Sequence, residues 1–201
     1  MTDERREGIM RAVYSALCSA GYADLTMQDI ADEAGLSKGA LHYHFDTKRD
    51  LLIAFLEHLY GLYTDRLAAA EDAAGDDPEE RLDALLDAAM YPPEKPAFRE
   101  FRTAVLEIKA QAPYEPAYRE RLAEFDGFLH DRVEAILADG VERGLFDDEV
   151  DPDAVASFVV TVINGAHTRG VAVGHPVEEV RETLGDYLDG EYATDREVEA
   201  R

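Results

Sequence analysis

The sequence predicts an all-α protein, and three observations lead to this prediction. Apolar residues recur every three to four positions in successive segments, as they do along one face of a helix. Clusters of Gly, Pro and Asp separate these segments, and the alternating patterns typical of strands are almost absent. Hydrophobic residues make up 46% of the 201 residues, which is enough for a buried core.

The first helix is predicted to begin after Thr2, because Ile9, Val13 and Leu17 have helical spacing, and to end at Gly21.

Two short helices are predicted next. Thr26 caps the first of them, and Asp29 at the third helical position completes a capping box with Asp in place of the usual Glu. Gly35 ends this helix after two turns, and Ser37 caps the next one.

The rest of the chain predicts longer helices. Thr47 caps a fourth helix that reaches about residue 74, and Gly75–Pro78 breaks the chain before a fifth that starts at the proline. The stretch MYPPEKP predicts a kinked connection. Val159–Ile163 could form a buried strand by residue type, but its flanking length and the lack of a partner strand favour a helix. Further helices are predicted at Phe98–Ala110, Tyr118–Gly140, Asp153–Gly170 and Val177–Leu188.

Charge is distributed unevenly along the chain. Residues 1–50 carry six Lys/Arg and nine Asp/Glu, a net charge of −3, which leaves −21 for residues 51–201. Two of the four lysines, Lys38 and Lys48, lie within the stretch LSKGALHYHFDTK. An acidic surface with few lysines is typical of a salt-loaded cytoplasm such as that of a haloarchaeon, although acidic proteins of other origin exist. We therefore expect a halophilic protein.

Several classes of protein are disfavoured by the sequence. Cys18 is the only cysteine, which leaves no internal disulfide or thiolate metal cluster and favours a reducing compartment. No charged-then-apolar leader is recognised, and no apolar run reaches the roughly 18 residues of a membrane span. We expect a cytoplasmic protein with no membrane partner, no metal or other cofactor and no catalytic residues, because the sequence offers no nucleophile–base pair or metal-ligand cluster.

Residues 37–45 present two different faces when they are placed on a helix. Leu41 and Phe45 lie on the side that can pack against Ile30 of the preceding helix. The opposite side is small at its N-terminal end, where backbone N–H groups and the helix dipole favour phosphate, and carries hydrogen-bonding side chains behind. Gly39 costs about 1 kcal/mol relative to Ala in a helix interior, which indicates close approach to a groove. Two short helices joined in this way predict a helix-turn-helix.

The stretch LTMQDIADEAGLSKGALHYHFDTKRDLL resembles the DNA-binding segment of the TetR family of transcriptional regulators, over about residues 5–55. The resemblance implies that the third helix enters the major groove of double-stranded DNA. Lys38 would read a guanine edge or bind phosphate, and the other side chains would mainly position the backbone. The residues expected to contact DNA are Thr26, Gln28, Ser37, Lys38, Gly39, Ala40, His42, Tyr43, His44 and Lys48.

The histidines and the tyrosine of this stretch also have plainer interpretations. His42 and His44 are two residues apart and do not share a helical face, so they cannot form the i, i+4 pair of a zinc site. Tyr43 taken alone could be an ordinary surface residue. The scattered histidines are expected to be core or satisfied polar residues rather than ligands: His58, His130, His167 and His175.

The last two predicted helices favour a dimer. Residues 153–166 are apolar nearly all round and need cover on every side, and the final helix offers an apolar stripe that could complete a four-helix interface between two copies. The resemblance implies the same homodimer, whereas both helices could instead pack inside one chain. The residues expected at the interface are Val159, Ile163, Val177, Val180, Leu184 and Leu188.

A small-molecule pocket is expected among the fourth to eighth helices. Aromatic side chains with a few polar groups would line it, although such a stripe can equally be core. Arg102 could hold an acidic ligand or pair with a carboxylate. The candidate residues are Tyr60, Tyr63, Met90, Tyr91, Phe98, Phe101, Arg102, Phe125, Phe128 and Asn164.

These observations lead to one functional hypothesis and one alternative. The first is a homodimeric repressor that binds a palindromic operator and is released by an unidentified small-molecule effector. The alternative is a DNA-binding regulator or architectural protein without such an effector. We expect a helix-turn-helix domain over 1–50, linked by the fourth helix from about residue 47 to an effector and dimerisation domain over 51–190, and a polar tail over 191–201.

Overall fold

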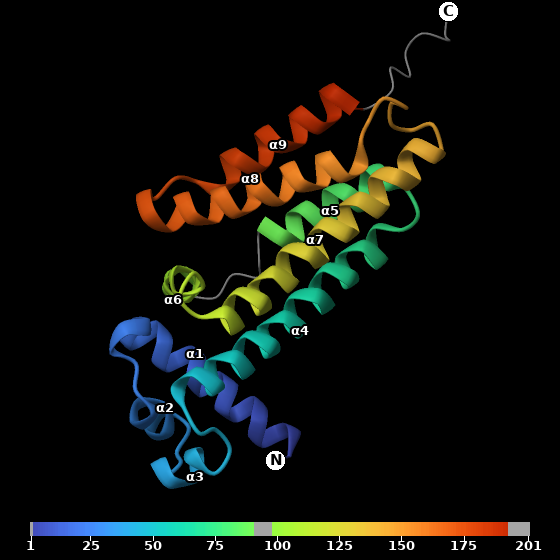
Figure 1. The fold of residues 1–201 in the computed structure, drawn as a ribbon. Coiled ribbons are helices and arrows are strands. Elements are labelled where there is room, and N and C mark those ends of the chain that lie inside the picture. The colour runs from blue at the N-terminus through green and yellow to red at the C-terminus, as the bar shows by residue number, and fades with distance from the viewer. Residues whose placement is uncertain (1, 91–97, 193–201) are drawn as a thin grey trace, which may run out of the picture. The chain divides into compact units, whose positions relative to one another are not determined.

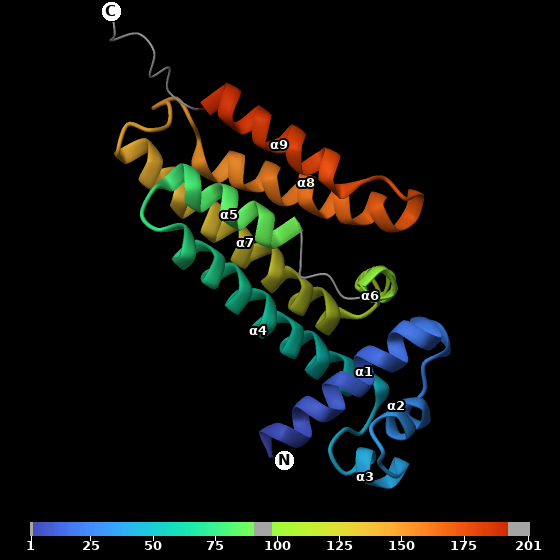
Figure 2. The same cartoon turned by 180° about the vertical axis from the view of Figure 1, so that it is seen from behind.

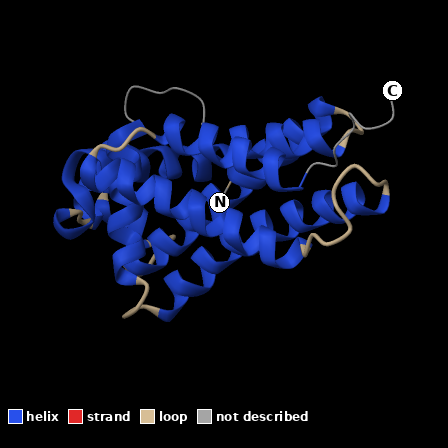
Figure 3. Ribbon diagram, turned by 90° about the horizontal axis from the view of Figure 1, so that it is seen from above, coloured by secondary structure: helices blue, strands red, loops and turns tan. Residues whose placement is uncertain are grey.

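The structure, a computed structural model, describes residues 2–90 and 98–192, with side chains for 2–90 and 102–190. The regular secondary structure of these residues consists of helices, without a β-strand, as Figure 3 shows, so the all-α prediction is confirmed. Within the same ranges, every helix falls short of the length and apolar character that a membrane span requires.

The helices match those predicted from the sequence to within a few residues at each end. Val159–Ile163 lies inside a helix, as its flanking length indicated, whereas residues 91–97 of the predicted kinked connection lie outside the described residues. In chain order the helices are α1 (Asp3–Asp24), α2 (Met27–Glu33), α3 (Lys38–His42), α4 (Lys48–Ala74), α5 (Pro78–Met90), α6 (Phe98–Gln111), α7 (Pro116–Glu142), α8 (Pro152–Val173) and α9 (Val177–Tyr192) (Figure 1).

The helices group into two compact units, each with its own core. One unit comprises Met1–Leu62 and Glu94–Phe125, and the other comprises Tyr63–Pro93 and Asp126–Arg201. Both α4 and α7 contribute residues to each unit. By packing, therefore, α6 belongs with the helix-turn-helix segment, while the functional division at residue 50 stays a prediction.

The first unit is built around α1. This helix packs against both α2 and α6, and α2 packs against α3 (Figure 2). Val13, Ile30 and Leu41 are fully buried in the shared core, with Phe45 packed against it. The inner face predicted for the third helix is thus confirmed.

The second unit brings together α5, the C-terminal half of α7, and the adjacent helices α8 and α9 (Figure 1). Apolar side chains from all of these elements form one core, and α5 packs against both α8 and α9. Arg181, which is buried, donates from Nε to Asp87 Oδ1 at 2.8 Å and also pairs with Asp83, so α9 is tied to α5 by charge as well.

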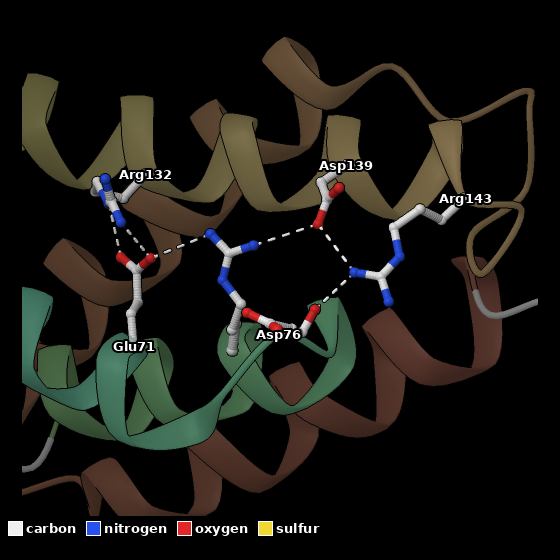
Figure 4. Close-up of polar contacts among 6 residues, drawn as sticks. Glu71, Asp76, Arg132, Asp139 and Arg143 are labelled. Carbon is white, nitrogen blue, oxygen red and sulfur yellow. Dashed lines mark hydrogen bonds and ion pairs between the residues drawn. The ribbon is translucent and has the colours of Figure 1, made fainter.

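A chain of alternating charges connects three helices of the second unit (Figure 4). Glu71 of α4 is only 3% exposed and accepts from Arg132 Nε of α7 at 2.7 Å. Arg81 of α5 lies 3.5 Å from the same carboxylate and 3.3 Å from Asp139 of α7, which in turn pairs with Arg143 at 3.3 Å. A buried carboxylate is costly unless it is paired, and here two guanidinium groups satisfy it.

Most of the residues expected at the dimer interface also belong to the core of this single chain. Val159, Ile163, Val177, Leu184 and Leu188 are buried in the core of this single chain, and Val180 packs against that core. The apolar pattern of α8 runs nearly all round the helix, so it does not reveal which side meets the chain's own core. The buried side chains leave little surface for a second copy, whereas Val180 is partly exposed, and the dimer interface stays a prediction.

Candidate nucleic-acid interface

The turn between α2 and α3 is set by Gly35, whose φ of +63° lies in the left-handed region that L side chains rarely adopt. Its N–H donates to Asp32 O at 3.1 Å, and the N–H of Leu36 donates to Ala31 O at 2.8 Å. This pair of bonds is a Schellman motif, which satisfies the last carbonyls of α2. The angle at which α3 leaves α2 is therefore fixed by local backbone chemistry.

Side-chain caps begin both helices of the motif, as predicted. Thr26 Oγ1 accepts from the N–H of Asp29 at 3.2 Å, and the Asp29 carboxylate accepts from the N–H of Thr26 at 2.8 Å. The hydrogen bond from the Thr26 hydroxyl holds the pKa of Asp29 below its usual value. Ser37 caps α3 by accepting from the N–H of Ala40 at 3.1 Å.

The outer face of α3 is open to solvent. The helix ends at His42, shorter than the predicted 37–45, but Tyr43 keeps helical φ and ψ and projects with 84% of its surface exposed. Its ring meets that of His44 edge-on, with centroids 5.1 Å apart. A Cβ on Gly39 would meet nothing within 4 Å, so no internal crowding requires glycine there. This favours a close approach from outside the chain.

The remaining predicted contact residues lie around this face. Ser37, Lys38 and His42 are exposed, and Ala40 and His44 are partly exposed. Gln28 on α2 donates from its amide to Asp32 Oδ1 at 2.7 Å. The individual contacts of these residues with DNA stay predictions.

Lys48 has an internal role that the sequence did not indicate. Its ammonium group donates to Tyr22 O and to Leu25 O, both at 2.9 Å, and lies 4.7 Å from the centre of the Tyr22 ring. Partial burial lowers the pKa of Lys48, an effect that Asp24 opposes. Lys48, which was expected to bind phosphate, therefore joins the start of α4 to the corner between α1 and α2.

A second group of contacts ties α6 and the start of α7 to the same corner. Glu107 on α6 accepts from the N–H of Tyr22 at 2.5 Å, immediately after Gly21, whose φ of +72° interrupts α1. A Cβ at Gly21 would come within 3.1 Å of the same carboxylate. Arg49 donates in bidentate fashion to Glu115, with N–O distances of 2.7 and 2.9 Å.

Sequence reasoning missed Glu107, Tyr22, Arg49 and Glu115 as a connected group. Glu107 lies 85 residues from Tyr22, and no spacing rule links them. The available signal was Gly21, which was predicted to end the first helix, whereas α1 continues to Asp24 with a break in its helical φ and ψ at Gly21.

The predicted pocket residues are divided between the two units. Tyr60 and Phe125 belong to the first, where their rings meet edge-on with centroids 5.3 Å apart. In the second, Met90 is buried in the core and Tyr63 and Phe128 pack against it, while the amide of Asn164 donates to Asp126 at 3.0 Å. Arg102 is partly exposed on α6. Tyr91 and the side chains of Phe98 and Phe101 lie outside the described residues.

A fully capped pair of short helices, with a rigid turn and an exposed polar face on the second, defines a helix-turn-helix DNA-binding protein. Two family models extend this conclusion over most of the chain. Residues 10–55 match the model of the bacterial regulatory proteins of the tetR family, and residues 78–193 match that of the BetI-type transcriptional repressor C-terminal domain. The chain belongs to the TetR family of DNA-binding transcriptional regulators.

Individual relatives agree with this assignment. A TetR transcription regulator from Haloarcula marismortui has 39% sequence identity and a TM-score of 0.88, over 95% of this chain and 100% of its own. A putative regulator from Saccharomonospora viridis, solved in complex with choline, has 25% identity and a TM-score of 0.83, over 96% and 99% of the two chains. The transcriptional repressor AcnR of Corynebacterium glutamicum is 25% identical over 94% of this chain and 92% of its own. These relatives are regulators rather than enzymes.

We predict that Tyr43→Ala weakens operator binding about tenfold, because one hydrogen bond to a charged phosphate is lost, and leaves stability unchanged. Tyr114→Ala is the matched control, since Tyr114 is 85% exposed but lies between α6 and α7. Fluorescence anisotropy on an operator duplex, identified by genomic mapping of bound sites, measures both variants. Equal affinities for the two would remove Tyr43 from the interface.

Lys48→Met is expected to lower the free energy of unfolding by about 2 kcal/mol, because two carbonyls lose a charged donor. Lys38→Met should weaken operator binding without this loss, since Lys38 is exposed on α3. Urea denaturation and operator titration of both variants separate the two roles. If Lys48→Met is as stable as the wild type and weakens only DNA binding, the phosphate role predicted from the sequence is the correct one.

Proposed function

We propose that the protein is a homodimeric repressor that leaves a palindromic operator when a small molecule binds outside the helix-turn-helix. The observation that carries this proposal is the hydrogen bond from the N–H of Tyr22 to Glu107, which connects α6 to the corner before α2. The repressor names of relatives such as AcnR support the direction of control.

The contacts within the first unit explain how a ligand would act on DNA binding. The backbone carbonyl of Tyr22 accepts from Lys48, and the Tyr22 ring meets the ring of Tyr118 of α7 edge-on, with centroids 6.4 Å apart. Arg49 and Glu115 add a bidentate pair between α4 and the turn before α7. A displacement of α6 would therefore shift the α1–α2 corner and with it α3, provided that the ligand binds the two positions of α6 with different affinity.

The proposed dimer uses the outer faces of α8 and α9. Phe158 and Tyr187 are large apolar side chains that are 44% and 45% exposed, and their rings lie 5.5 Å apart. The exposed positions of α8 around Phe158 are small: Ala154, Ser157, Thr161 and Gly165. Small side chains let a second helix approach closely, so two copies could bury this face against each other.

Choline is a reasonable first effector to test. The regulator from Saccharomonospora viridis binds it, and residues 78–193 match the BetI-type domain. Quaternary ammonium groups bind over aromatic rings, and Tyr60 and Phe125 form an aromatic pair in this chain. The strongly acidic composition also favours a cationic ligand over an anionic one.

The acidic composition supports a halophilic origin as well. Two observations support this origin: the net charge of −24 with only four lysines, and the 39% sequence identity to a regulator from Haloarcula marismortui. At low salt, carboxylates on such a surface repel each other, whereas dense cations screen them.

We predict that choline chloride releases the wild-type protein from its operator and that Glu107→Ala binds choline but is released much less. Without the carboxylate, the hydrogen bond from the Tyr22 N–H to α6 is lost, so a displacement of α6 no longer moves the Tyr22 backbone. Glu120→Ala, which removes an exposed acid of α7, is the control. Calorimetry follows choline binding and anisotropy follows release. Choline that binds the wild type without releasing it would support a regulator without a small-molecule effector, and a lack of choline binding would exclude choline as the effector.

Phe158→Glu is expected to produce folded monomers that bind the operator poorly, because a charge in the proposed seam cannot be buried without a partner. Leu62→Glu is the control, since Leu62 is a large apolar residue of α4 with similar exposure. Light scattering measures the oligomeric state, and circular dichroism confirms that both variants fold. Dimers of unchanged affinity in Phe158→Glu would place the interface elsewhere.

Folding and operator binding should both persist at molar KCl, and folding should weaken as salt is removed. At about 1 M salt the Debye length is about 3 Å, so repulsion among carboxylates is screened. Few basic residues face the DNA, and counterion release is correspondingly small. Circular dichroism and binding between about 0.1 and 2 M KCl test this. A stable fold at low salt, with affinity collapsing as salt rises, would refute the halophilic interpretation.

A further inference from the structure

Three potential metal ligands converge in the second unit, away from the helix-turn-helix. His130 and Glu134 are one helical turn apart on α7, and the first turn of α8 brings Asp153 beside them. One ligand atom from each residue lies within 4.8 Å of the other two. His130 Nε2 is 3.3 Å from Asp153 Oδ1, and Nδ1 is 3.9 Å from Glu134 Oε2.

The surroundings of His130 favour a cation. Its side chain is 22% exposed, and its ionic neighbours among the described residues are all carboxylates, with Asp131 3.7 Å from Nδ1 as the third. Glu134 and Asp153 together carry a charge of −2, which a divalent ion would neutralise. The same residues without an ion leave like charges close together, at a cost in free energy.

We propose that His130, Glu134 and Asp153 form a binding site for a divalent transition-metal ion such as Zn²⁺. Imidazole nitrogen with carboxylate oxygen is a ligand set that suits Zn²⁺ and Co²⁺ rather than Mg²⁺ or Ca²⁺, which take oxygen ligands. Metal–ligand bonds are about 2.0–2.2 Å long, so the ligand atoms must draw together by about an ångström. Asp153 and Glu134 are exposed enough to make this movement.

The site would join α7 to the start of α8. Asp153 lies one residue past the N1 proline of α8, whose cap is Asp151. Metal binding would therefore stabilise the second unit against unfolding, and it would do so whether or not the proposed repressor mechanism is correct. Sequence reasoning set His130 aside as structural. The i, i+4 spacing to Glu134 was a usable signal, but nothing in the sequence places Asp153 beside them.

The test uses the whole chain after a chelator has removed any bound metal. It is titrated with Zn²⁺ and, separately, with Co²⁺ in about 1 M KCl, where diffuse binding to the acidic surface is screened. We expect one ion per chain, a visible Co²⁺ absorption band, and a rise in Tm of about 5 °C at a hundredfold excess over Kd. His130→Gln, Glu134→Gln and Asp153→Asn should each weaken binding at least about tenfold.

Matched controls remove the same chemistry elsewhere: His175→Gln, Glu142→Gln on α7 and Asp148→Asn. These should bind the metal as the wild type does. Several results would overturn the proposal: no stoichiometric binding of either ion, equal loss in the controls, or binding that depends on Asp131 but not on Asp153. Circular dichroism of each variant ensures that lost binding is not lost folding.

Discussion

The ammonium group of Lys48 joins the helix-turn-helix to the long helix α4. It satisfies the carbonyls of Tyr22 and Leu25, which lie at the corner where α1 gives way to α2, and its own residue begins α4. One cation thus fixes the long helix relative to the pair of short ones. Glu107 holds the N–H of Tyr22 at the same corner. Backbone groups at this one corner are therefore contacted by both α4 and α6.

Local chemistry made much of this fold predictable. The capping box of Thr26 and Asp29, the cap at Ser37 and the left-handed Gly35 involve residues at most five apart, so their residue types determine the bonds directly. The exposed face of α3 follows from the same periodicity that buries Leu41. The candidate DNA-binding surface could therefore be located from the sequence.

Contacts between distant segments could not be predicted. Lys48 was expected to reach phosphate because it stands just past the turn, at the start of the fourth helix, yet two carbonyls more than 20 residues away bind it. The side of α8 that meets the chain's own core could not be predicted, because an all-round apolar helix gives periodicity no side to choose. Phe158, on the exposed side, is as apolar as Val159 on the buried one. Only the packing of α5 and α9 distinguishes them.

The charge chain of the second unit has a consequence for how this sequence can change over evolutionary time. Glu71, Arg81, Arg132 and Asp139 each contact at least one group of opposite sign, and the central carboxylate is buried. Losing an arginine leaves the buried Glu71 carboxylate with fewer partners, whereas replacing a partnered pair together with apolar residues does not. Substitutions at these positions should therefore be inherited jointly, and an alignment of relatives should show positions 71 and 132 covarying more tightly than their exposed neighbours.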